Sequence, residues 1–263
     1  MEITLTNKFI SGCDIDLSNK KLGIIHQPKI KELIEKDIKI SDITTLFSLI
    51  EHSYWKLSRD IFIEKLPSKF ILALTIDKIN ENKTNHINNL FIALSILYEV
   101  DINNIIIDSF DNEIAILIKD KNVLINEDNF DIFLDVVLNM FKIDKNELHK
   151  PLKKEDEWVE LSGTQREKDM IEFFKKRKKE REEKEKLHLN DYINIVVHIG
   201  KYTYDYVISL TYWQLMNSLK SLQIIEKYKE MLGYTWSYKF DIKSEDNPHW
   251  IKEIKLEQDT IEL

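Results

Sequence analysis

Apolar residues recur at intervals of three and four along several stretches of the chain, which is the pattern of an amphipathic helix. The clearest stretch begins after Ser41, a predicted N-cap, and others lie after Pro67, before Tyr98 and from Phe130 onward. A shorter helix is predicted after Pro28, because proline fits the first turn of a helix. The stripe of the clearest stretch consists of Ile43, Leu46, Phe47, Ile50, Tyr54 and Leu57.

A second pattern, the alternation or clustering of β-branched residues between turn residues, predicts strands. Residues 3–25 show it as short apolar runs separated by SGCD and SNKK. Residues 104–125 contain three isoleucine- and valine-rich runs separated by Asp-Asn and Asp-Lys-Asn, which predict a small antiparallel meander. Together with the helices, this pattern predicts a compact α+β domain over residues 1–150.

Beyond Pro151 the composition changes to charged residues. Thr164 and Glu167 have the spacing of a capping box, and residues 175–186 contain almost nothing but charge. Glutamates precede lysines by four residues in this run, so its helix needs little packing against other elements. Residues 151–190 are therefore predicted to form a charged helical linker.

The C-terminal part, residues 191–263, is predicted to be a small helical domain with an aromatic tail. Residues 191–199 fit either a short strand or a buried helix, and the length of the run does not decide between them. Thr203 and Thr211 are predicted N-caps, and Gly233 is the predicted end of the long helix. The chain as a whole is predicted to be α+β and mostly helical.

Composition narrows the function classes. The net charge of −8 argues against non-specific nucleic-acid binding over the whole surface. The only cysteine, Cys13, permits no intramolecular disulfide, which fits a reducing compartment. The first residues lack the pattern of a signal peptide, and no apolar run is long enough for a membrane span. We therefore expect no association with a membrane.

The sequence contains no recognisable catalytic motif. Ser162-Gly163-Thr164 lacks the lysine and preceding glycine of a P-loop, HExxH is absent, and the histidines have no metal-ligand spacing. His188 and His198 are interpreted as structural or surface residues. A nucleophilic pair such as Cys13 with His26 stays open, although no local signature favours it. We expect no enzyme activity, catalytic residue, metal or cofactor.

Two clusters are candidates for binding. The basic residues 175–179 fit contacts with phosphates, but the acids that follow them favour a solvated helix, so nucleic-acid binding is not the main hypothesis. Tyrosine and tryptophan are typical anchors of protein interfaces. The favoured interpretation is that most of these rings pack the C-terminal core, with some ring edges left to a partner. The candidate partner-binding residues are Tyr204, Tyr206, Tyr212, Trp213, Trp236 and Trp250.

The C-terminal strings carry a resemblance to a known group of proteins. An apolar run ends at Gly200, YTYDY begins at Tyr202, and LTYWQL leads into a helix that reads LKSLQIIEKY. Over residues 155–235 the chain resembles tail-region proteins of tailed bacteriophages of Gram-positive hosts, which are commonly classed with tail assembly chaperones. The resemblance implies a non-enzymatic protein that holds a tail component, such as the tape-measure protein, ready for assembly.

This resemblance leaves alternatives open. A tail assembly chaperone acts in the host cytoplasm and is absent from the finished particle, whereas a structural protein of the tail, neck or baseplate stays in the virion. A homo-oligomer is compatible with either function.

Overall fold

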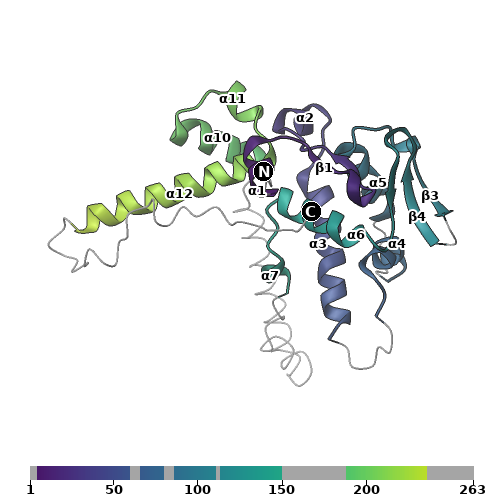
Figure 1. Cartoon of the computed structure of the whole chain (residues 1–263). Helices are drawn as coiled ribbons and strands as arrows, with labels where there is room; N and C mark the ends of the chain where they lie inside the picture. Colours follow the sequence, from purple (N-terminus) through teal and green to yellow (C-terminus); the bar gives the residue numbers. More distant parts are fainter. Residues whose placement is uncertain (1–4, 60–65, 80–85, 111–112, 150–187, 236–263) are drawn as a thin grey trace, which may run out of the picture.

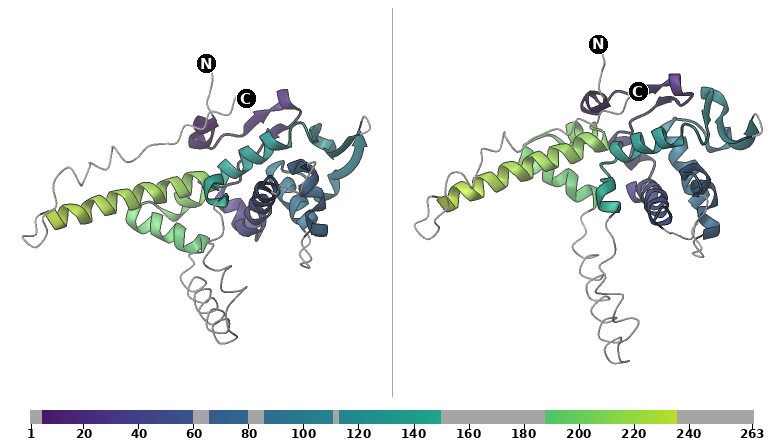
Figure 2. Two further views of the ribbon diagram at one scale, coloured as in Figure 1. Left: turned by 90° about the horizontal axis from the view of Figure 1, so that it is seen from below. Right: turned by 60° about the horizontal axis from the view of Figure 1, so that its bottom comes forward.

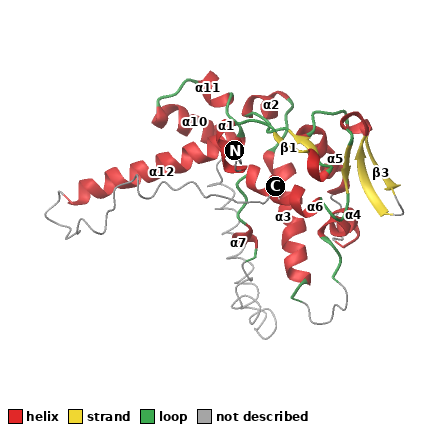
Figure 3. Cartoon of the chain, viewed as in Figure 1, coloured by secondary structure: helices red, strands yellow, loops and turns green. Residues whose placement is uncertain are grey.

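The computed structural model describes residues 5–59, 66–79, 86–110, 113–149 and 188–235 (Figure 1). Within these ranges the chain is mostly helical and contains two small antiparallel sheets (Figure 3). The predicted fold class, α+β and mostly helical, is confirmed. The division into domains 1–150, 151–190 and 191–263 stays a prediction. None of the helices in the described ranges has the length and apolar character needed to cross a membrane.

The first sheet pairs β1 (Ile15–Leu17) with β2 (Gly23–Ile25), and Ile15 lies opposite Ile25. The second sheet has the order β3-β4-β5, with β3 at one edge. Its strands are β3 (Ile105–Phe110), β4 (Glu113–Ile118) and β5 (Val123–Ile125). The three predicted β-rich runs therefore form the predicted meander.

Helices make up most of the described residues and carry most of the core. In chain order they are α1 (Leu5–Ser11), α2 (Ile30–Glu35), α3 (Ile40–Leu57), α4 (Lys69–Ile79), α5 (His86–Leu97), α6 (Phe130–Met140), α7 (Lys145–Leu148), α10 (Leu189–Gly200), α11 (Tyr204–Ile208) and α12 (Tyr212–Thr235). The predicted helices after Pro28, near Ser41, after Pro67, before Tyr98 and from Phe130 are all present.

Three local predictions are wrong. Residues 5–11 form the helix α1 instead of a strand, because Leu5 and Phe9 are four residues apart and both are buried on one helical face. Helix α3 begins at Ile40 after Lys39, so Ser41 lies inside the first turn and is not its N-cap. Helix α12 continues through Gly233 to Thr235, because glycine weakens a helix by only about 1 kcal/mol and does not forbid it.

The larger core cluster lies between α3, α4, α5, α6 and the sheets. Phe133 of α6 is at its centre, in ring contact with Phe47, Tyr98 and Phe130 at centroid distances of 5.9, 6.4 and 6.0 Å. Burial of the Tyr98 hydroxyl raises its pKa above the usual value for tyrosine. Ile43, Leu46, Phe47 and Ile50, the first four residues of the α3 stripe, are buried in this cluster. Because all four face the same core, apolar residues recur regularly at helical spacing in this segment.

A smaller core cluster lies between α10, α11 and α12, and it includes Ile30 of α2. Figures 1 and 2 show α12 extending away from the N-terminal elements, with α10 beside its first half. The apolar run at 191–199, which fitted either a strand or a helix, is therefore the helix α10. Since Ile30 belongs to this cluster, the C-terminal helices pack directly against the N-terminal part of the chain.

Candidate functional site

Local capping explains the shape of the C-terminal helices. The Thr203 hydroxyl accepts from the Tyr206 N–H at 3.3 Å, which starts α11 as predicted. At the start of α12, Thr211 and Gln214 cap each other: the Gln214 N–H donates to the Thr211 hydroxyl, and the Thr211 N–H donates to the Gln214 side-chain oxygen. These two caps fix the turns that place the tyrosines on the outside.

Four large side chains near α11 are exposed, and we call them the tyrosine surface: Ile199, Tyr202, Tyr204 and Tyr206. Each of these four residues has between 46% and 50% of its surface exposed to solvent. The Tyr202 and Tyr206 rings contact each other at 5.1 Å, and the Tyr202 ring also covers Gly200, where an added Cβ would come within 2.6 Å of it. The sequence of α10 and α11 therefore orders these rings without burying them.

Tyr204 lies against α10 and is held by polar contacts. Its hydroxyl donates to the Asn194 side-chain oxygen at 2.8 Å and lies 3.4 Å from the His198 Nε2. The His198 ring meets the Tyr204 ring edge-on at 6.2 Å. His198 is thus a surface residue with a structural contact, as the sequence indicated.

The six candidate partner-binding residues fall into different environments. Tyr204 and Tyr206 are exposed, and the Tyr206 ring contacts Tyr202, which the sequence had placed in the same aromatic set. Tyr212 is partly buried against the Phe141 ring at 5.8 Å. Trp213 is only 5% exposed. Trp236 and Trp250 lie outside the described residues, as do the capping box at Thr164, the charged linker and the basic run 175–179.

Trp213 holds the C-terminal helices to α1. The Trp213 ring stacks on the Phe9 ring at a centroid distance of 5.8 Å. The Lys142 ammonium lies over the same Trp213 ring, 4.2 Å from its centroid. Hydrogen bonds support the same junction: the Gln214 side-chain amide donates to the Ile10 carbonyl at 2.7 Å, and the Ile30 backbone N–H donates to the Leu210 carbonyl at 2.9 Å. Trp213 therefore anchors this internal junction and offers little surface to a partner.

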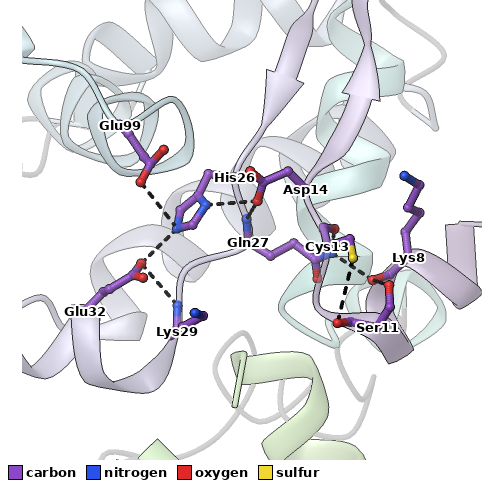
Figure 4. Close-up of polar contacts among 9 residues, drawn as sticks. All are labelled: Lys8, Ser11, Cys13, Asp14, His26, Gln27, Lys29, Glu32 and Glu99. Atoms are coloured by element: carbon purple, nitrogen blue, oxygen red, sulfur yellow. Dashed lines mark hydrogen bonds and ion pairs between the residues drawn. The ribbon is translucent and has the colours of Figure 1, made fainter. Parts of the chain in front are cut away.

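A polar cluster around His26 lies next to this junction (Figure 4). The His26 Nδ1 is 3.0 Å from the Asp14 carboxylate, and its Nε2 is 2.8 Å from Glu32 and 3.9 Å from Glu99. Burial opposes the charge on His26, but the hydrogen bond that it donates to the Glu32 carboxylate and the charges of Glu99 and Asp14 outweigh burial and raise the pKa of His26. The cluster ties the start of β1, α2 and the end of α5 together.

This cluster disfavours the Cys13–His26 pair that the sequence left open. Both ring nitrogens of His26 are occupied by carboxylates, and the Cys13 thiol lies beside the Ser11 carbonyl at 4.0 Å. The contact between Asp14 and His26 could have been expected from the register of the first hairpin. Because Ile15 pairs with Ile25, Asp14 and His26 are the next positions along the two strands and lie opposite each other. No group of three or more metal-ligating side chains suited to a metal ion occurs among the described residues.

A second ionic cluster joins α3, α4 and α7. The Glu51 side chain is 4% exposed, and its two oxygens lie 2.8 Å from the Lys69 ammonium and 3.0 Å from the His149 Nε2. Burial would raise the pKa of Glu51, but the contact with Lys69 and the charge of Lys145 outweigh burial and lower it. The His149 ring also stacks on Trp55 at 5.6 Å. Glu51 contacts both Lys69 and His149 inside the cluster, so we interpret the cluster as structural.

Comparison with known protein families matches a C-terminal segment of the chain. Residues 176–255 match a family model described as the YomV second domain. YomV is a protein of a Bacillus phage region, so the match links this segment to phage-related proteins. The described part of the matched segment consists of α10, α11 and α12, which carry the tyrosine surface. The match covers less than a third of the chain. Neither the curated proteins nor the solved structures contain a match.

Proposed function

We propose that this chain is a non-enzymatic, phage tail assembly chaperone-like protein that binds a tail component such as the tape-measure protein. The observation that carries the proposal is the tyrosine surface, which lies inside the phage-related segment. The match to the YomV second domain supports a phage-related protein, and the step from there to tail assembly rests on the resemblance of the C-terminal strings.

The physical character of the tyrosine surface supports binding to a protein. Tyrosine offers a large ring and a polar hydroxyl at a small cost in side-chain entropy, which makes it one of the residue types that dominate interface energies. The ring contacts between Tyr202 and Tyr206, and the hydrogen bond from Tyr204 to Asn194, hold the side chains in place before a partner arrives. Preorganisation of this kind strengthens binding because less freedom is lost.

The test is co-purification of the full-length chain with the tape-measure protein when both are produced in one host. We expect the wild-type chain to retain the tape-measure protein and the Tyr204→Ala/Tyr206→Ala variant to lose it at least about tenfold, the effect of removing a typical interface anchor. The matched control is Ile24→Ala, because Ile24 is similarly exposed but lies on β2. Equal retention by all three chains would contradict the proposal.

The competing hypothesis is a structural protein of the phage tail, neck or baseplate. Mass spectrometry of purified virions separates it from the proposal, because a structural protein is recovered at a fixed number of copies per particle. Abundant peptides of this chain in the virion would refute the chaperone function.

A further inference from the structure

Residues 26–30 join the N-terminal core to the C-terminal helices, and we call them the strap. On the N-terminal side, the His26 N–H donates to the Leu97 carbonyl at the end of α5 at 2.7 Å. The Gln27 side chain is buried, and its amide donates to the Lys8 carbonyl of α1 at 3.1 Å. The beginning of the strap is therefore fixed to the N-terminal part of the chain.

The other end of the strap holds the C-terminal helices. Lys29 forms an isolated antiparallel bridge with Thr211, the residue that precedes α12. The Ile30 N–H donates to the Leu210 carbonyl at 2.9 Å, and the Ile30 side chain is fully buried in the smaller core cluster. A shift of the strap would therefore alter the attachment of α10, α11 and α12.

The His26 side chain lies at the beginning of the strap and faces carboxylates from three segments (Figure 4). Asp14 precedes β1, Glu32 lies on α2, and Glu99 lies in the turn after α5. The Nδ1 of His26 is 3.0 Å from Asp14, and its Nε2 is 2.8 Å from Glu32. An ionised carboxylate only accepts hydrogen bonds, so both contacts are made only when both ring nitrogens carry a proton.

The same two carboxylate oxygens also bind the backbone of the strap. The Asp14 oxygen that contacts His26 accepts from the Gln27 N–H at 3.3 Å, and the Glu32 oxygen that contacts His26 accepts from the Lys29 N–H at 3.3 Å. A neutral imidazole has one bare nitrogen, whose lone pair would face one of these oxygens. Either tautomer therefore disturbs a carboxylate that holds the strap.

We propose that His26 is a proton-dependent latch: its protonated ring holds the strap in place, and loss of the proton loosens the attachment of α10, α11 and α12. Burial of the ring lowers the pKa of His26, but the hydrogen bond to Glu32 and the charges of Glu99 and Asp14 outweigh burial and raise it. The latch is thus fully formed below the usual histidine pKa and opens as the pH rises through the raised folded-state pKa.

Hydrogen exchange of the Ile30 amide in the full-length chain tests the proposal, because this amide donates across the junction to Leu210. Its protection, corrected for the intrinsic pH dependence of exchange, should fall at least about tenfold between about pH 5.5 and about pH 8.5. Tenfold is the effect of losing one hydrogen bond to a charged group. The Phe133 amide, at the centre of the larger core, reports unfolding of the whole chain and should stay more protected than Ile30.

His26→Gln is the diagnostic variant, because glutamine offers a hydrogen-bond donor but does not titrate. In this variant the Ile30 amide should be equally protected at both pH values. His198→Gln, the same substitution at an exposed histidine of α10, should keep the pH dependence of the wild type.

Three outcomes contradict the proposal. The first is protection of the wild-type Ile30 amide that does not change with pH, and the second is a pH dependence that His26→Gln retains. The third is exchange of Ile30 only together with Phe133 at both pH values, because the whole chain would then unfold instead of the junction opening. None of these outcomes depends on whether the tyrosine surface binds a tail component.

Discussion

The ionic cluster at Glu51 gives the sharpest stability prediction. Replacing Glu51 with alanine leaves the Lys69 ammonium, whose side chain is only 13% exposed, without its closest counter-charge. The next carboxylate, on Asp131, is 3.9 Å away and largely exposed. Breaking a buried pair by removing one partner typically costs about 3–5 kcal/mol, because a charge is left uncompensated.

We take about 3 kcal/mol, the lower end of this range, because Lys69 keeps Asp131 nearby and is not completely buried. For a chain of this size each kcal/mol lowers the Tm by about 2–4 °C, so Glu51→Ala should lower it by roughly 6–12 °C. Equilibrium unfolding in urea would measure the same loss as a lower midpoint with an unchanged slope.

The surface provides a matched control. Lys31 and Glu35 form an ion pair four residues apart on α2, but both side chains are about three-fifths exposed. Glu35→Ala should therefore change the unfolding free energy by less than about 0.5 kcal/mol. The double variant Glu51→Leu/Lys69→Met should be more stable than Glu51→Ala, because it leaves no buried charge alone. A Glu51→Ala chain as stable as Glu35→Ala would refute the reasoning.

The pKa of Glu51 adds a pH dependence to this prediction. Its folded-state pKa is lowered from 4.5, so the cluster stabilises the fold above that value and loses its effect as the pH falls through the folded pKa. The difference between wild type and Glu51→Gln should therefore shrink in acid.

Two further predictions concern His26 and Trp213. The folded-state pKa of His26 is raised from 6.5, so its contacts stabilise the fold fully below that pH and lose their effect as the pH rises through the folded pKa. The stability gap between wild type and His26→Gln should be largest in mild acid and narrow as the pH rises through the folded pKa, and a gap independent of pH would contradict this; NMR titration of the ring checks the pKa. Trp213→Ala removes the stack on Phe9 and should cost about 3–5 kcal/mol in denaturant unfolding, whereas a loss near zero would show that the ring is not an anchor.

Sequence periodicity predicted the elements whose core contacts are local. The α3 stripe and the β3-β4-β5 meander were recognisable because neighbouring residues determine their faces. Helix α1 was not recognisable, since it has only two turns and its burial depends on Trp213 of α12. Short elements take their conformation from distant partners, and no local pattern reports those partners.

The candidate site shows the same limit. Tyr204 and Tyr206 are exposed, whereas the sequence favoured core packing for most of these rings, and their binding to a partner stays a prediction. The burial of Trp213 follows from the approach of α1 and could not be derived from the adjacent residues. The His26 cluster requires three segments to converge, although the Asp14–His26 part follows once the register of the first hairpin is known.

The contact between α1 and α12 also has a consequence for synthesis of the chain on the ribosome. The hydrogen bond from Gln214 to Ile10 spans 204 residues, and the Phe9–Trp213 stack spans the same stretch. At typical translation rates, roughly 10–40 seconds pass between the emergence of the two ends. Throughout that interval the apolar face of α1 has no Trp213 to cover it, so the nascent chain completes its N-terminal core only after the helices described before α12 have been made.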